Sequence, residues 1–166
     1  MMNTKNIGSS LCDVYLPKEV KGELLAKCVL KRHVGFDIDI EKSYVGYCGL
    51  NVKRLIGLMA VMRLKDVAKT DAVNVPIRYR DCPHISLDEA RLIAAKVDYG
   101  DGRKASDHEH PFLRYPHPLY WVFSLTGGDG SIAGGSVYVD RVDGHVWSSD
   151  ELEEYSHDFN NEFLSI

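Results

Sequence analysis

Hydrophobic and polar side chains alternate along residues 119–125, and this alternation is the clearest structural signal in the chain. A period of two with aromatic and β-branched residues is typical of a strand that has one face buried. A glycine-rich connection at 127–135 leads to a second predicted strand at 136–140. The side chains that we expect to face the core are Leu119, Trp121, Phe123 and Leu125, with Val137 and Val139 opposite them.

A tight turn at residues 140–144 follows and joins the second strand to a short third strand at 145–147. Gly144 can take the left-handed conformation that such a turn needs, and the Asp143 carboxylate can accept a hydrogen bond from the backbone after it. Ser148 and Glu151 then have the spacing of a capping box. The sequence therefore predicts a final helix with an acidic first turn.

The first half of the chain alternates between helical and strand patterns. Apolar residues recur at helical spacing from Pro17 onward, and residues 34–41 alternate apolar with acidic residues such as Asp37 and Asp39. Pro76 cannot donate a ladder hydrogen bond, so its strand is expected at a sheet edge. The predicted elements are a helix at 17–32, a strand at 34–41 with its hairpin partner at 44–48, a helix at 52–69 capped by Asn51, and a strand at 73–79.

The helix predicted at 52–69 is apolar almost all round. Such a helix is either buried or covers a partner, and we favour burial against the sheet. Its broad apolar surface comprises Leu55, Ile56, Met59, Met62 and Val67.

Ser86 and Glu89 form a second capping box, which starts a clear helix at 86–97. Its expected inward residues are Leu87, Ala90, Ile93, Ala94 and Val97. Residues 98–118 are charged and rich in histidine and proline, so we expect a long functional or mobile loop there.

These elements predict an α+β fold, with an antiparallel sheet of about five or six strands and helices packed mainly on one face. Residues 1–82 are expected to form an N-terminal helix and strand extension packed on the core. Residues 83–166 are expected to form the second domain, although one compact domain overall also suits the length of 166 residues.

Charge is unevenly distributed over a net −4: residues 1–82 hold 14 basic and 9 acidic residues, and residues 83–166 hold 6 and 15. An acidic half disfavours nucleic acid as a partner and favours a basic protein surface. Four scattered cysteines read as reduced, mostly buried thiols, and no apolar run reaches the length of a membrane span. We therefore expect a cytoplasmic protein that does not bind a membrane.

The most chemical-looking cluster is Asp107-His108-Glu109-His110, with His117 nearby. Imidazole and carboxylate groups at this density could hold zinc, but the segment lies between prolines and has no thiolate close in sequence. Because no common catalytic or phosphate-binding motif occurs, we expect no enzyme activity, metal or cofactor. A metal-dependent or small-molecule-binding protein remains the alternative.

The order of elements in residues 85–159 resembles the helix-plus-meander plan of PepSY-like domains, and more closely the YrhB-like immunity proteins of bacterial polymorphic-toxin systems. The matching segments are Trp121 with Phe123, Ala133-Gly134, Val139-Asp140 with Gly144, and Leu152-Glu153-Glu154-Tyr155. The resemblance implies an α+β inhibitor that binds a cognate toxin or secreted effector and occludes its active site. A PepSY-like peptidase regulator is a further alternative.

An acidic rim with tyrosine anchors would then dock on a basic toxin surface. Oligomeric state does not follow from the sequence. The predicted partner-binding residues are Asp98, Asp101, Asp107, Glu109, Tyr115, Tyr120, Asp129, Glu153 and Glu154.

Overall fold

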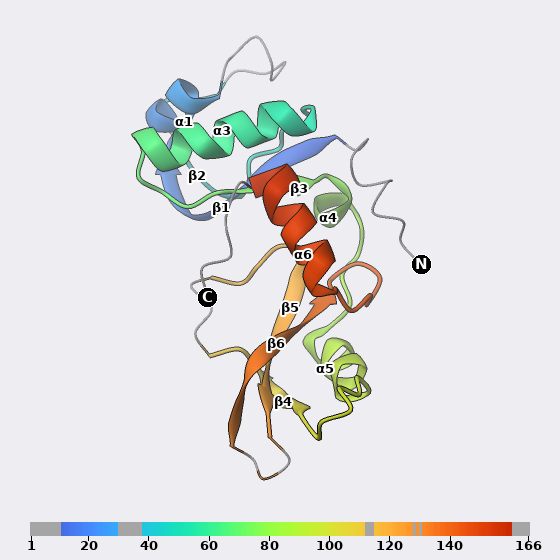
Figure 1. The fold of residues 1–166 in the computed structure, drawn as a ribbon. Helices are drawn as coiled ribbons and strands as arrows, with labels where there is room; N and C mark the ends of the chain where they lie inside the picture. The colour runs from blue at the N-terminus through green and yellow to red at the C-terminus, as the bar shows by residue number, and fades with distance from the viewer. Residues whose placement is uncertain (1–10, 30–37, 112–114, 128, 130, 161–166) are drawn as a thin grey trace. The chain divides into compact units, whose positions relative to one another are not determined.

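The computed structural model describes residues 11–29, 38–111, 115–127, 129 and 131–160, which form six strands and five α-helices (Figure 1). They divide into two compact units. We call Cys82–Ser149 the meander unit, and Met2–Asp81 together with Asp150–Ile166 the split unit. The segment after Ser149 therefore groups with the N-terminal part of the chain.

The α+β class is confirmed, but the described strands do not form one sheet of five or six. They form two antiparallel sheets of three strands each, in the orders β2-β1-β3 and β4-β5-β6. The patterns of β2, β3, β5 and β6 were visible in the sequence. Sheet membership was not, because it depends on which strands pair at a distance.

The sheet of the split unit is built on β1 (Cys12–Lys21), which pairs with both β2 (Ser43–Tyr47) and β3 (Val73–Pro76). Helix α1 is short and covers only Gly22–Cys28. The helix predicted from Pro17 is therefore wrong for residues 17–21, which continue a strand. Cys12, Val14 and Leu16 are all fully buried, so the period-two pattern had already begun before Pro17.

The strand predicted at 34–41 is wrong in its described part. Residues 30–37, including Asp37, lie outside the described residues. Ile38–Glu41 form a turn in which the backbone N–H of Glu41 donates to the Asp39 carboxylate over 3.0 Å. Strand β2 pairs with β1, and the described residues 38–41 are not part of a strand. Strand β3, which contains Pro76, lies at the sheet edge as predicted.

Helix α3 (Arg54–Val67) packs one face against the sheet and α1. Its buried residues are Gly57, Ala60, Val61 and Leu64. The N-cap is Lys53, not the predicted Asn51, whose side-chain oxygen instead accepts a hydrogen bond from Arg80 over 2.8 Å. Gly57 meets β3 so closely that a Cβ atom there would overlap Oδ1 of Asn74.

The last described segment completes the split unit. Helix α6 (Ser149–Tyr155) continues into a π-helical turn, η2 (Ser156–Asn160). The Tyr155 hydroxyl donates to the backbone oxygen of Asn74 over 2.6 Å. Asp158 forms an ion pair of 3.1 Å with Arg54 at the start of α3. An acidic segment thus neutralises part of a basic one within the same unit.

The meander unit contains α5 (Leu87–Ala95), β4 (Lys104–Glu109), β5 (Tyr120–Thr126) and β6 (Ile132–Asp140), with α5 beside the sheet (Figure 1). The predicted capping box at Ser86 is present. The predicted core of β5 and β6 is confirmed, except that Trp121 is only partly buried. Two other predictions fail: Leu87 is exposed, and residues 104–109 form a strand rather than loop.

Strand β4 escaped detection because it is polar on both faces. Within the described residues it lies at the edge of the sheet and pairs with β5. Ala105 packs against the core, but the polar side chains around it leave no apolar alternation to mark the strand. The third strand predicted at 145–147 is reduced to a single bridge between Val139 and Val146. The turn before it forms as expected, with Gly144 at φ 74° and the His145 N–H donating to Asp143 over 2.9 Å.

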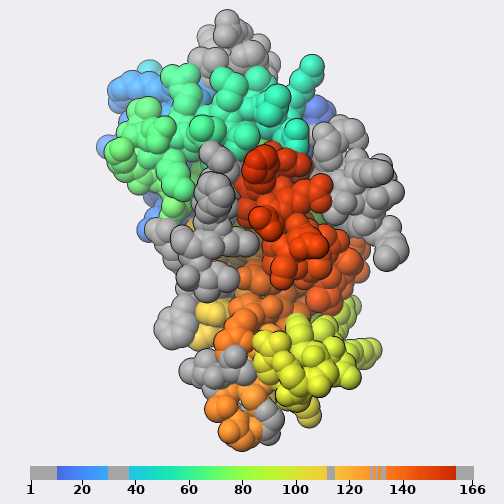
Figure 2. All heavy atoms as spheres, in the orientation of Figure 1, coloured from blue at the N-terminus to red at the C-terminus, as the bar shows by residue number. Residues whose placement is uncertain are grey.

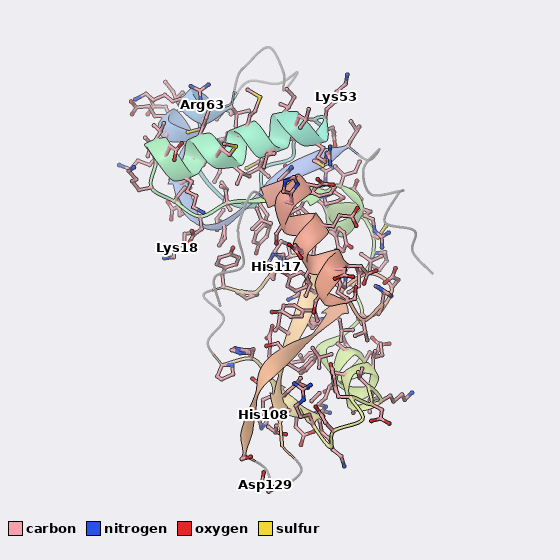
Figure 3. All side chains as sticks on the ribbon, in the orientation of Figure 1. Lys18, Lys53, Arg63, His108, His117 and Asp129 are labelled. Carbon is pink, nitrogen blue, oxygen red and sulfur yellow. The ribbon has the colours of Figure 1, made fainter. Side chains whose placement is uncertain are left out.

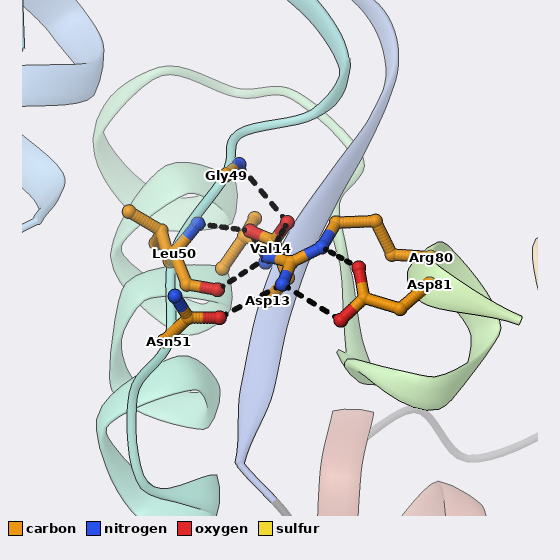
Figure 4. A network of polar contacts seen from close by, with 7 residues as sticks. All are labelled: Asp13, Val14, Gly49, Leu50, Asn51, Arg80 and Asp81. Atoms are coloured by element: carbon orange, nitrogen blue, oxygen red, sulfur yellow. Dashed lines mark hydrogen bonds and ion pairs between the residues drawn. The ribbon is translucent and has the colours of Figure 1, made fainter.

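The carboxylate of Asp13 is the polar centre of the split unit (Figure 4). Asp13 has no exposed surface, and its oxygens accept hydrogen bonds of 2.7–2.9 Å from the backbone N–H groups of Val14, Gly49 and Leu50. Arg80 of α4 (Arg78–Asp81) donates to the same carboxylate over 3.0 Å and to the Leu50 carbonyl over 2.8 Å. Three segments distant in sequence are therefore joined at one buried group.

We expect Asp13→Asn to destabilise the protein by roughly 1–3 kcal/mol, because it removes one of the two carboxylates paired with Arg80, the other being Asp81 at 2.7 Å, and turns an acceptor into a donor facing backbone N–H groups. Chemical denaturation measures the change. Glu23→Gln, which removes the exposed ion pair with Lys27, is the control and should leave stability nearly unchanged. Equal small effects of both substitutions would show that the network does not hold the unit together.

We expect Gly57→Ala to destabilise the protein, although alanine favours a helix by about 1 kcal/mol over glycine. The added methyl group would overlap Asn74, so α3 would have to move away from β3. Thermal unfolding decides the sign. A higher melting temperature than that of the unchanged chain would contradict the close packing of α3 on β3.

Candidate functional site

The predicted acidic rim is divided between the two compact units. Asp98, Asp101, Asp107 and Asp129 are exposed and Glu109 is partly buried, and all five lie in the meander unit. Glu153 and Glu154 are exposed on α6, in the split unit. Asp129 lies at the tip of the β5–β6 hairpin and His108 on β4 (Figure 3).

Three of these carboxylates take part in local turns. Asp98 accepts from the Gly100 N–H over 2.8 Å, Asp101 binds Arg103 over 2.7 Å, and Asp129 accepts from the Ser131 hydroxyl over 2.6 Å. Hydrogen bonds from the backbone of Arg103 and from the side chain of Ser131 lower the pKa of Asp101 and of Asp129, respectively. These aspartates therefore have a local structural role that needs no partner.

The net charge of −9 over residues 83–166 is not the net charge of either compact unit. Residues 82–149 hold nine acidic and six basic residues, a net −3. Residues 2–81 hold 14 basic and 9 acidic residues, and residues 150–166 add six acidic ones, so the split unit has a net −1. Folding thus places the acidic residues 150–166 in the same unit as residues 2–81, which carry a net positive charge.

The two predicted aromatic anchors lie beside His117 in the meander unit. Tyr115 is partly buried, with its ring centroid 6.4 Å from that of His117. Tyr120 is only 7% exposed, stacks on His117 at 4.0 Å and meets Tyr138 and Trp147 edge to face. The prediction of Tyr120 as an exposed anchor is therefore wrong, because its ring packs into an aromatic cluster.

Two buried charged groups support this cluster. Asp140 accepts hydrogen bonds from the Val142 N–H over 2.8 Å and from the Trp147 indole over 3.1 Å. The guanidinium of Arg141 lies 3.6 Å from the centre of the Trp121 ring, and its Nε donates to the His117 carbonyl over 2.8 Å. These contacts within the meander unit link both groups to its turn and its aromatic packing.

The histidine-rich segment is placed on β4 and beyond it. Asp107 and His108 are exposed, whereas Glu109 and His110 are partly buried. Within the described part of the chain, no group of three or more His, Cys, Asp or Glu side chains is placed to share a metal ion. All four cysteines are free, and burial raises the pKa of the Cys12 and Cys48 thiols to about 12.

Helix α3 carries four of the exposed large apolar side chains of the described residues, namely Leu55, Met59, Met62 and Val67. Leu55, Met59 and Met62 are 61%, 47% and 43% exposed. At about 100° per residue they fall within about 60° of one another, opposite the buried face of the helix. We call these three residues the α3 stripe. Figure 2 shows α3, in teal and green, at the surface of the molecule.

The α3 stripe corrects the expectation that this helix is buried all round. The sequence could not separate the two apolar faces, since both have helical spacing. The buried face combines two small residues, Gly57 and Ala60, with Val61 and Leu64. Gly57 lets the backbone of α3 lie close to Asn74 of β3.

We expect acid to destabilise the meander unit through His117. Burial of the ring, and secondarily the positive charge of Arg141, lower the pKa of His117 to about 3, and its Nδ1 accepts from the Leu119 N–H over 3.2 Å. Because the folded pKa lies below the unfolded value of about 6.5, the stabilisation is complete above pH of about 6.5 and is lost as pH falls towards about 3.

Urea denaturation at several pH values should therefore show stability decreasing with acid in this window, and less steeply in His117→Phe, which keeps an aromatic ring but cannot be protonated. Identical pH profiles for the two proteins would contradict a buried neutral His117.

No described helix has the length and apolar character needed to cross a membrane. The search of family models, of curated proteins and of solved structures found no match to this chain. The functional conclusion must therefore come from the residues of the chain and their geometry.

Proposed function

We propose that this chain is a binding protein without enzymatic activity, which neutralises a cognate bacterial toxin or secreted effector by covering its active site. The resemblance of residues 85–159 to YrhB-like immunity proteins supports the class of function. The α3 stripe supports the location of the interface, and it is the single observation on which the proposal depends.

Single exposed apolar residues are common on protein surfaces and need no explanation. The α3 stripe differs because its three large side chains are aligned at i, i+4 and i+7 on one helix. This is the spacing with which one helix presents anchors to a partner. Two of the three are methionines, whose flexible thioethers adapt to an irregular partner surface.

Helix α3 is packed against other elements on the face opposite the stripe. Its opposite face is buried against β1, β3 and α1, and its first residue is anchored to Asp158. A side chain presented from such a helix loses little backbone freedom on binding, which favours affinity. The predicted acidic rim is the competing interface, and the experiment below separates the two.

We expect Leu55→Glu combined with Met59→Glu to weaken binding of the cognate effector, sought first among the proteins encoded next to this chain, by about 2 kcal/mol or more, or about 30-fold, because both anchors are lost. The cells should lose protection against that effector to a corresponding degree. Calorimetry with purified proteins and survival of effector-producing cells measure the two effects.

The matched control is Leu92→Glu on α5, since Leu92 has the same 61% exposure as Leu55 but lies in the meander unit. It should bind and protect like the unchanged chain. Reversal of Asp107, Glu153 and Glu154 to lysine tests the acidic rim at exposed positions and leaves the turn-forming Asp98, Asp101 and Asp129 in place. If that variant alone lost protection, the interface would be the acidic rim. If the unchanged chain neither bound nor protected, the proposed function itself would be wrong.

A further inference from the structure

We infer that Met59 and Met62 form a reversible oxidation site, at which a peroxide converts the outer face of α3 from apolar to polar without unfolding the chain. Both side chains belong to the α3 stripe and both are exposed. The consequence for partner binding rests on the proposed function, since it requires the stripe to be the interface.

The thioethers of Met59 and Met62 are accessible from solvent. The two residues are 47% and 43% exposed, and neither belongs to the core cluster that the described residues of α3 form with β1. A methionine in a core often fills an irregular gap, but these two have no such role on the outer face. Their reactivity is therefore the property that distinguishes them from Leu55 in the same stripe.

The two methionines are neighbours on the helix. They are three residues apart, which places their Cβ atoms about 5–6 Å from each other. An oxidant that reaches this face therefore meets both thioethers. The side chains that hold α3 to the rest of its unit lie on the other face, and none of them contains sulfur: Gly57, Ala60, Val61 and Leu64. Oxidation would thus change the surface and leave the packing contacts in place.

The reaction is an oxygen transfer from the peroxide to sulfur. A lone pair of the thioether sulfur attacks one oxygen of hydrogen peroxide, the O–O bond breaks, and a sulfoxide forms. The sulfur is oxidised, and the peroxide is reduced, with its second oxygen leaving as water. A methionine sulfoxide reductase reverses the change with two thiols, which become a disulfide while the sulfoxide oxygen leaves as water.

The cysteines of the chain compete poorly for the same oxidant. Thiol oxidation proceeds through the thiolate, and burial raises the pKa of the Cys12 and Cys48 thiols to about 12. Cys28 is also buried, whereas Cys82 is exposed. The experiments therefore use Cys82→Ser as the background, in which the two thioethers are the accessible sulfur groups of the described residues.

A sulfoxide changes what the α3 stripe can bind. The added oxygen accepts hydrogen bonds and makes the side chain polar. If apolar groups of a partner covered that oxygen, it would be buried without a donor, which lowers affinity. Because two of the three stripe residues change, oxidation acts on most of the proposed interface.

The first measurement is the rate of oxidation in folded Cys82→Ser. Trypsin cuts after Arg54 and Arg63, so residues 55–63 form one peptide that carries both methionines. Mass spectrometry follows the oxygen taken up by this peptide after timed exposure of the protein to hydrogen peroxide. We expect both sulfurs to react nearly as fast as in a synthetic peptide of the same sequence. Strong protection in the folded protein would show that the thioethers are closed to the oxidant and would overturn the inference.

The second measurement separates a surface change from unfolding. The oxidised protein should melt no more than about 4 °C below the untreated protein, and it should elute earlier from a hydrophobic-interaction column. Treatment with a methionine sulfoxide reductase should restore the elution. Met59→Leu combined with Met62→Leu is the matched control, whose elution should be the same before and after peroxide. Loss of cooperative unfolding on oxidation, or an equal elution shift in the control, would contradict the site.

The third measurement is binding of the cognate effector after the peroxide has been removed. We expect oxidation of Cys82→Ser to weaken binding at least about tenfold and the reductase to restore it, whereas the double leucine variant should have one affinity before and after peroxide. If the effector bound oxidised and untreated protein equally, the proposed function would hold and the switch would be wrong. If it bound neither, while residues 55–63 were reversibly oxidised with the expected change in elution, the oxidation site would hold and the proposed function would be wrong.

Discussion

The buried carboxylate of Asp13 is the interaction on which the split unit depends. It lies in the central strand β1, accepts hydrogen bonds from the backbone at Gly49 and Leu50, and is paired with Arg80. A charge in such a position is tolerated only when its partners are complete. The loop after β2 and helix α4 are therefore fixed relative to β1. Since β1 also orders β2 and β3, this one group sets the sheet on which α3 packs.

The position of α3 determines which of its two apolar faces becomes a surface. Small residues, Gly57 and Ala60, let its backbone approach β3 and Asn74 closely. Helix α6 and its π-helical turn then complete the unit through Tyr155 and Asp158. What is left outward is an apolar sector that includes Leu55, Met59 and Met62. The proposed function follows from this division of the helix.

The meander unit has a different physical basis. Its core is formed by β5, β6 and α5, and its charged groups are used locally. Asp140 holds the turn and the Trp147 indole, while Arg141 lies over Trp121. Three of the seven acidic residues predicted to bind a partner, Asp98, Asp101 and Asp129, are engaged in local turns. The −9 balance of residues 83–166 is therefore distributed over both units and does not define one docking surface.

The sequence by itself determined the local elements whose signals are short-ranged: the Ser86 capping box, the existence of strand β5, the Gly144 turn and the edge position of Pro76. It also determined that an apolar helix lies within residues 52–69, where the structure has α3 (Arg54–Val67). It did not determine the burial of β5, because Tyr120 and Val122 on its other face are buried as well. Only the tertiary structure decided the rest, because pairing between distant strands leaves no periodic signal. Polar β4, the extension of β1 through Pro17 and the division into two sheets depend on such pairing. Burial of Tyr120 and exposure of Leu55, Met59 and Met62 likewise depend on neighbours distant in sequence, so the candidate site became visible only in the folded chain.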